Sequence, residues 1–136
     1  MAAAHDAAWG GFDETSPAGL CFTSGSTGQP KGVTYTHRSN FLHTFKLLAA
    51  EVLGAKSTDV VMPIVPLFHA NAWGLPFAAP AAGSTLVLPG RHLDGASLAD
   101  LIEAEGVTIA FGVPTVFLGL CGPLEAAQRA LPSRQR

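Results

Sequence analysis

The amino-acid sequence predicts an α/β fold in which crossover helices connect a partial parallel sheet. Two observations lead to this prediction. Apolar runs of strand type alternate with helical patterns along the chain, and the composition is unusually apolar. Charged residues make up 13% of the 136 positions, whereas typical soluble domains hold about 25%.

A small domain exposes proportionally more surface than a large one, so it should be more polar rather than less. Hydrophobic residues nevertheless reach 48%, and the mean hydropathy is +0.31. We therefore interpret the chain as the interior portion of a larger domain that lacks some covering layers. A complete, alanine-rich small domain is the alternative.

The first half of the predicted fold consists of two short strands and a helix. The strands, residues 20–23 and 33–36, flank a loop rich in glycine, serine and threonine. Thr36 or Ser39 can cap the helix that follows, and Gly54 can end it. The helix is predicted because apolar residues recur on one face of a 3.6-residue repeat. These residues are Phe41, Phe45, Leu48 and Val52.

Strands then alternate with helices. Asp94 can cap one helix, Gly106 can end it, and Pro114 suits the first turn of the last helix. This alternation is typical of a parallel sheet with right-handed crossovers. The last strand has no following partner, which leaves an open sheet edge. The predicted strands are residues 60–65, 85–88 and 107–111, and helical turns are expected over 70–82.

The loop between the first two strands has the composition of a phosphate-binding site. Glycines let the backbone turn its N–H groups toward an anion, hydroxyl groups can donate to phosphate oxygens, and a lysine supplies positive charge. The glycines are Gly25, Gly28 and Gly32, the hydroxyl residues are Thr23, Ser24, Ser26 and Thr27, and the lysine is Lys31.

Two better-known phosphate loops do not match. In the Walker A pattern counted from Gly25, Pro30 stands where the second glycine belongs, and Gly32 follows the lysine in place of Ser or Thr. The dinucleotide fingerprint Gly-x-Gly-x-x-Gly is also absent. A flexible surface loop would not require Pro30-Lys31-Gly32 in fixed order between two apolar strands, so we favour phosphate binding.

Other features exclude several function classes. The net charge of −2 and the scattered basic residues argue against nucleic acid or an anionic membrane as a partner. Cys21 and Cys121 fit neither a disulfide framework nor a metal site, and we expect buried free thiols in a reducing compartment. The N-terminus lacks the features of a signal peptide, so a cytoplasmic protein is expected. Residues 60–90 carry no charge, but five prolines argue against a transmembrane helix.

The loop Thr23–Gly32 resembles the signature of the adenylate-forming superfamily, the AMP-dependent synthetases and ligases, also called acyl-activating enzymes. Residues 66–76 resemble the corresponding segment of medium- and long-chain fatty-acyl-CoA synthetases. The stretch from Pro89 to Thr115 is similar to the same branch. The resemblance covers roughly residues 12–120, and it implies that 1–136 is a partial AMP-binding domain, a piece of the family's large N-terminal domain.

The resemblance implies a reaction and its co-substrates. These enzymes join a carboxylate to ATP with Mg²⁺, release pyrophosphate, and pass the acyl group to coenzyme A. The loop would hold the β- and γ-phosphates, and His69 would lie by the adenylate. Trp73 would lie at the acyl tunnel, with Gly112, Val113 and Pro114 near the acyl pocket. Without the resemblance, a lone histidine such as His69 is more often a core residue, and simple core packing is the alternative for Trp73. Tyr35 and His37 are expected to be structural.

The chain does not contain the family's later motifs, which are Tyr-Gly-x-Thr-Glu, Thr-Gly-Asp and a C-terminal domain with a catalytic lysine. We therefore expect a fragment of a fatty-acid–CoA ligase that forms no acyl-CoA alone. One alternative is a non-catalytic remnant with weak nucleotide binding. Another is an unrelated α/β module with a coincidental loop.

Overall fold

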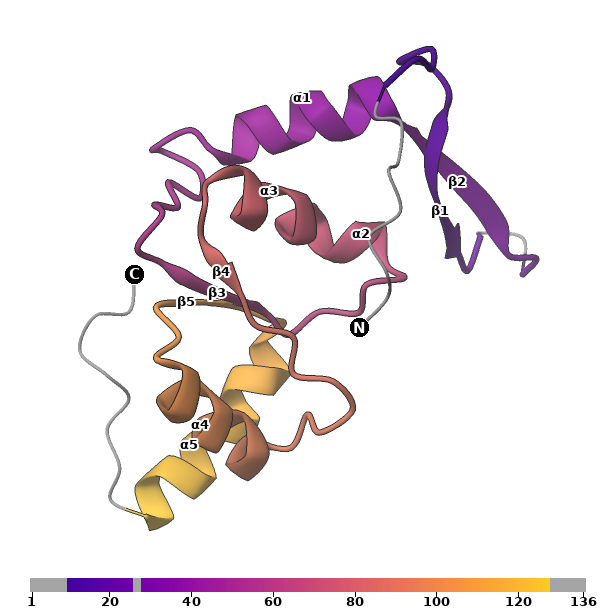
Figure 1. The fold of residues 1–136 in the computed structure, drawn as a ribbon. Helices are drawn as coiled ribbons and strands as arrows, with labels where there is room; N and C mark the ends of the chain where they lie inside the picture. Colours follow the sequence, from indigo (N-terminus) through magenta and orange to yellow (C-terminus); the bar gives the residue numbers. More distant parts are fainter. Residues whose placement is uncertain (1–9, 26–27, 128–136) are drawn as a thin grey trace, which may run out of the picture.

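The computed structural model describes residues 10–25 and 28–127, and it contains two separate sheets (Figure 1). Strands β1 (Pro17–Thr23) and β2 (Lys31–Thr36) form an antiparallel hairpin. Strands β3 (Val60–Pro63), β4 (Thr85–Leu86) and β5 (Ile109–Phe111) form a parallel sheet in the order β4-β3-β5. The predicted partial parallel sheet with crossover helices is confirmed, but the first two strands lie outside it.

Helices cover both faces of the parallel sheet (Figure 1). On one side lie α3 (Leu75–Ala81) and, above it, α1 (His37–Leu47), while α4 (Gly95–Glu105) and α5 (Pro114–Ala126) lie on the other side. The short element α2 (Ala70–Trp73) leads into α3. The larger core cluster joins the sheet to α4 and α5. It consists of Met62, Ile64, Val87, Leu98, Ala99, Ile102, Val107 and Leu120.

A polar network joins the beginnings of β3 and β5. Asp59 is 7% exposed and accepts hydrogen bonds from the Lys56 backbone N–H (2.8 Å) and from the Thr108 hydroxyl (3.0 Å). The same hydroxyl oxygen accepts a bond from the Val60 N–H at 3.0 Å. Thr108 therefore connects two strands that are almost fifty residues apart in the sequence.

Helix α1 begins as predicted, since Thr36 is its N-cap and forms a reciprocal capping box with Ser39. It ends earlier than predicted, at Leu47, and irregular turns lead on to Gly54. The apolar face that predicted the helix is not buried, because Phe41 and Phe45 are 69% and 70% exposed.

The physical reason is that α1 packs through its opposite side. His43 and Leu47 lie one turn apart, and both closely approach Gly74 at the start of α3. No residue of α1 is buried within the part of the chain that the structure describes. An apolar helix face thus remains open to solvent.

The predictions about the ends of α4 and about the two cysteines have clear outcomes. Asp94 caps α4 by accepting a 2.9 Å bond from the Ser97 N–H, and Gly106 ends that helix in a left-handed conformation. Cys21 is buried as expected, but Cys121 is exposed because it lies on the solvent side of α5. Among the described residues, no helix is long and apolar enough to cross a bilayer.

Candidate functional site

The predicted phosphate loop connects the two strands of the hairpin at the end farthest from α1 (Figure 1). Thr23 and Lys31 face each other as the last pair of the ladder, so the chain reverses direction between them. Thr23, Ser24 and Lys31 are all exposed. Ser26 and Thr27, which the sequence also assigned to the site, lie outside the described residues.

Glycine is required in this loop for a steric reason. Gly25 has φ +59°, and a Cβ atom there would lie only 2.3 Å from the carbonyl oxygen of Gln29. Gly28 also has a positive φ, and its N–H points back to the Gly25 carbonyl at 3.4 Å. The described part of the loop is therefore a tight turn with exposed hydroxyl side chains at Thr23 and Ser24 and the exposed ammonium group of Lys31. This set of donors suits a polyphosphate.

The other predicted residues follow the carboxyl ends of β3 and β5. The two strands end side by side, because Pro63 pairs with Phe111 and the Ile64 N–H donates to the Phe111 carbonyl at 2.6 Å. The segment that leads to His69 continues from β3, while Gly112 and Val113 continue from β5. In parallel sheets, ligands bind at this edge, where successive connections leave a central strand in opposite directions. The order β4-β3-β5 creates such a point between β3 and β5.

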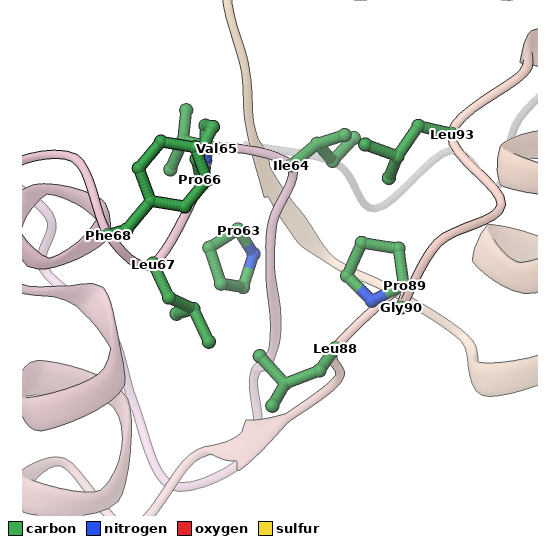
Figure 2. A pocket seen from close by; sticks show the side chains of 10 residues that line it. All are labelled: Pro63, Ile64, Val65, Pro66, Leu67, Phe68, Leu88, Pro89, Gly90 and Leu93. Atoms are coloured by element: carbon green, nitrogen blue, oxygen red, sulfur yellow. The ribbon is translucent and has the colours of Figure 1, made fainter.

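An apolar cavity of about 440 Å³ opens at the same edge. Figure 2 shows side chains of the segment after β3 facing those of the segment after β4. Leu67 and Phe68 come from the first segment and Leu88 from the second, and Pro63, the last residue of β3, also lines the cavity. His69 follows Phe68 directly and is exposed in the part of the domain that this chain contains. Val113 is 44% exposed and caps α5, with Pro114 at the first helical position.

Trp73 lies on an unusual piece of backbone. The four residues Ala70–Trp73 all have positive φ values, between 46° and 56°, and Gly74 continues with φ +78°. Element α2 is thus one turn of left-handed helix, which costs about 1–2 kcal/mol per residue for residues other than glycine. Ala72 is fully buried, whereas Trp73 is 38% exposed. Trp73 is thus partly open to solvent in the part of the domain that this chain contains.

A second cavity, of about 540 Å³, lies between this turn and α1. Its wall is mostly apolar, with a few polar groups, and it includes Tyr35, His43, Asn71 and Trp73. The His43 Nε2 atom lies 3.0 Å from the Trp73 carbonyl oxygen. Tyr35 was expected to be structural, yet it faces this cavity.

The hairpin contacts the turn through a buried thiol. The Cys21 Sγ donates to Asn71 Oδ1 at 3.2 Å, which ties β1 to the segment that carries His69 and Trp73. Sequence reasoning missed both His43 and Asn71. Their only sequence signals are weak: asparagine tolerates left-handed backbone better than most residues, and a glycine follows the turn. His37, expected to be structural, stacks on Phe12 with ring centroids 4.1 Å apart.

Comparisons with known proteins identify the family of the chain. Residues 6–136 match the AMP-binding enzyme family. The chain is 47% identical over 131 residues to 3-methylmercaptopropionyl-CoA ligase from Ruegeria lacuscaerulensis, and the alignment covers 96% of the chain and 24% of that protein. It is 52% identical over 112 residues to medium-chain-fatty-acid–CoA ligase from Ectopseudomonas oleovorans, which covers 82% and 20% respectively.

A solved structure shows the same arrangement. O-succinylbenzoate coenzyme A synthetase from Bacillus subtilis, in complex with AMP, superposes with a TM-score of 0.72 at 29% identity. The match covers 91% of this chain and 24% of that one. The chain thus spans about a quarter or less of the length of the relatives it matches. It belongs to the AMP-binding enzyme family, on the acyl-CoA synthetase branch, and corresponds to a fragment of the large N-terminal domain of adenylate-forming enzymes.

Proposed function

We propose that this chain is part of an ATP-dependent fatty-acid–CoA ligase of medium- or long-chain type. In that enzyme it would bind the phosphates of ATP and line the acyl site. The observation that carries the proposal is the narrow hairpin loop, in which Gly25 permits the turn and Lys31 stands opposite Thr23. Relatives named as medium-chain and long-chain fatty-acid–CoA ligases, 52% and 46% identical, support the substrate class.

The proposed reaction has two steps. A carboxylate oxygen of the fatty acid attacks the α-phosphorus of ATP, and pyrophosphate leaves with the electron pair of the broken P–O bond. The thiolate of coenzyme A then attacks the acyl carbon and releases AMP. Charge builds up on the departing pyrophosphate, so preorganised donors around it lower the barrier of the first step.

Each proposed residue has one task in this scheme. Thr23, Ser24 and the N–H group at Gly25 would donate to the β- and γ-phosphates, together with the Ser26 and Thr27 hydroxyls, while Gly28 would let the loop turn around them. Lys31 would balance part of their charge. Mg²⁺ takes part in the proposed reaction, although no group of three His, Cys, Asp or Glu side chains that could hold a metal ion lies among the described residues. The ion would neutralise phosphate charge when bound with the nucleotide.

The remaining residues belong to the acyl side. His69 is exposed at the edge where the parallel strands end, and we assign it to the adenylate and the carboxylate that is activated. Trp73, Gly112, Val113 and Pro114 would contact the acyl group. We propose no nucleic-acid partner for the chain. The reaction would take place in the cytoplasm.

The test compares the chain with a hybrid enzyme. In the hybrid, residues 6–136 replace the matching segment of the Ectopseudomonas oleovorans ligase. ATP-dependent octanoyl-CoA formation is expected from the hybrid and not from the 136-residue chain. Lys31→Ala should lower kcat/KM for ATP about ten- to hundredfold in the hybrid, because it removes charge-assisted hydrogen bonds. Lys46→Ala, on α1, is the matched control and should change kcat/KM little.

Two outcomes would contradict the proposal. A folded but inactive hybrid, beside an active parent ligase, would favour the alternative of a non-catalytic remnant. Equal activity of the Lys31→Ala and Lys46→Ala hybrids would remove the assigned role of the loop.

A further inference from the structure

The left-handed turn Ala70–Trp73 is an unfavourable backbone arrangement that the surrounding structure must hold. Such outliers persist only where neighbouring contacts over-determine them, and they gather at functional sites. Two contacts reach this turn from elements far away in the sequence. One comes from His43 on α1 and the other from Cys21 on β1.

The His43 contact acts directly on the residue that carries the indole ring. A carbonyl oxygen can only accept, so the 3.0 Å contact requires that His43 Nε2 carries a proton and donates to the Trp73 oxygen. The imidazole also lies close to Gly74, the residue after Trp73. A Cβ atom on Gly74 would lie 2.4 Å from His43 Cδ2. The close approach thus depends on glycine at that position.

Both side chains line the same cavity. Its volume of about 540 Å³ lies within the range of about 300–1,000 Å³ that is usual for ligand pockets. His43 contributes to its lining from α1, and Trp73 contributes from the turn Ala70–Trp73. A shift of the Trp73 backbone would move the indole and change the width of the cavity.

We propose that His43 is a positioning residue that holds Trp73 in place and thereby determines which acyl chain lengths enter this cavity. The inference rests on the proposed function, because it assumes that Trp73 contacts the acyl group. Loss of the hydrogen bond from His43 would let the left-handed turn relax. The indole would then take several positions, and the cavity would select less strictly among chains.

The experiment follows the fluorescence of Trp73 in the 136-residue chain. Trp9→Phe leaves Trp73 as the one tryptophan in the sequence. In this background, saturated fatty acids from butyrate to palmitate are titrated into the protein at low protein concentration. Acrylamide quenching of Trp73 is measured without ligand. His43→Ala should increase the quenching constant. It should also reduce the affinity ratio between the best and the poorest acid by about two- to tenfold, the range expected for one hydrogen bond.

Three further variants separate positioning from folding. His43→Gln keeps a donor and should restore most of the selectivity. Gly74→Ala should act like His43→Ala, since its methyl group displaces the imidazole. His37→Ala, on the same helix but stacked on Phe12, is the matched control and should leave Trp73 unchanged.

The outcomes distinguish the two proposals. Suppose that acids bind, but the His43→Ala variant shows the same quenching constant and the same order of acid affinities as the parent chain. The role of His43 is then refuted, while the ligase assignment stands. If no acid alters Trp73 emission in the parent chain, both the role of His43 and the acyl contact of Trp73 are refuted. The phosphate role of Lys31 is judged separately, by the ATP dependence of the hybrid enzyme.

Discussion

Replacing Thr108 with valine removes one hydroxyl group and keeps the shape of the side chain. That hydroxyl accepts the Val60 N–H and donates to Asp59 Oδ1, both at 3.0 Å. It therefore fastens the beginning of β5 to the beginning of the central strand β3. Valine can make neither bond. The backbone bond from the Thr108 N–H to the Val60 carbonyl, at 2.9 Å, would remain.

The structure allows the cost to be worked out. Leaving a buried partner without its hydrogen bond costs about 1–3 kcal/mol. Two partners lose a bond here, but Asp59 keeps its bond from the Lys56 N–H, and Val60 is only partly buried. The penalty should thus lie near the middle of the range for one group, at about 2 kcal/mol, which corresponds to roughly a thirtyfold change in the unfolding equilibrium.

Urea unfolding followed by far-UV circular dichroism measures this free energy. Sub-micromolar chain concentration keeps association from contributing. Thr108→Ser is the control, because it retains the hydroxyl and loses only one methyl group, at a cost of about 0.8 kcal/mol. The reasoning is refuted if Thr108→Val unfolds within about 0.5 kcal/mol of the wild type, or if the serine variant is the less stable of the two.

Three other predictions concern the helices. Thr36→Ala removes the capping box of α1 and should cost about 1 kcal/mol in urea unfolding; an unchanged midpoint would contradict the cap. The backbone hydrogen bond from Ser97 lowers the pKa of Asp94. The stabilisation of the folded state by this carboxylate should therefore be present above the carboxyl pKa of the unfolded chain, and it should be lost as the pH falls through the lower pKa of the folded state. The stability gap between wild type and Asp94→Asn, measured against pH, should change only in that acid window. Phe41→Lys with Phe45→Glu should raise the concentration at which light scattering detects association by at least about tenfold, since both rings are about 70% exposed.

Much of the fold was predictable because its signals are local. The alternation of apolar strands and helices predicted the parallel sheet. The helix ends were also predicted, since Thr36 caps α1, Asp94 caps α4, and α4 ends at Gly106. The separate hairpin was not predicted. Two strands around a short loop satisfy the same local pattern whether they join a sheet or pair only with each other, and that choice depends on partners elsewhere.

The two halves of the candidate site differ in the same way. The turn of the phosphate loop is encoded in the loop itself, because Gly25 leaves no room for a Cβ atom beside Gln29. The left-handed turn before Gly74 has no such local code. Ala70 and Ala72 would prefer right-handed backbone, and their conformation depends on His43 and Cys21, about thirty and fifty residues earlier.

Helix α1 shows what such dependence implies for stability. One of its sides carries His43 and Leu47 and contacts the turn at Gly74, while the opposite side exposes Phe41 and Phe45. Short helices are marginal by themselves and gain most of their stability from burying an apolar face. In this chain the better apolar face of α1 is the exposed one, so the contact with Gly74 and the Thr36 cap must hold the helix. Any partner surface that covered Phe41 and Phe45 would stabilise α1, and through His43 it would also tighten the position of Trp73.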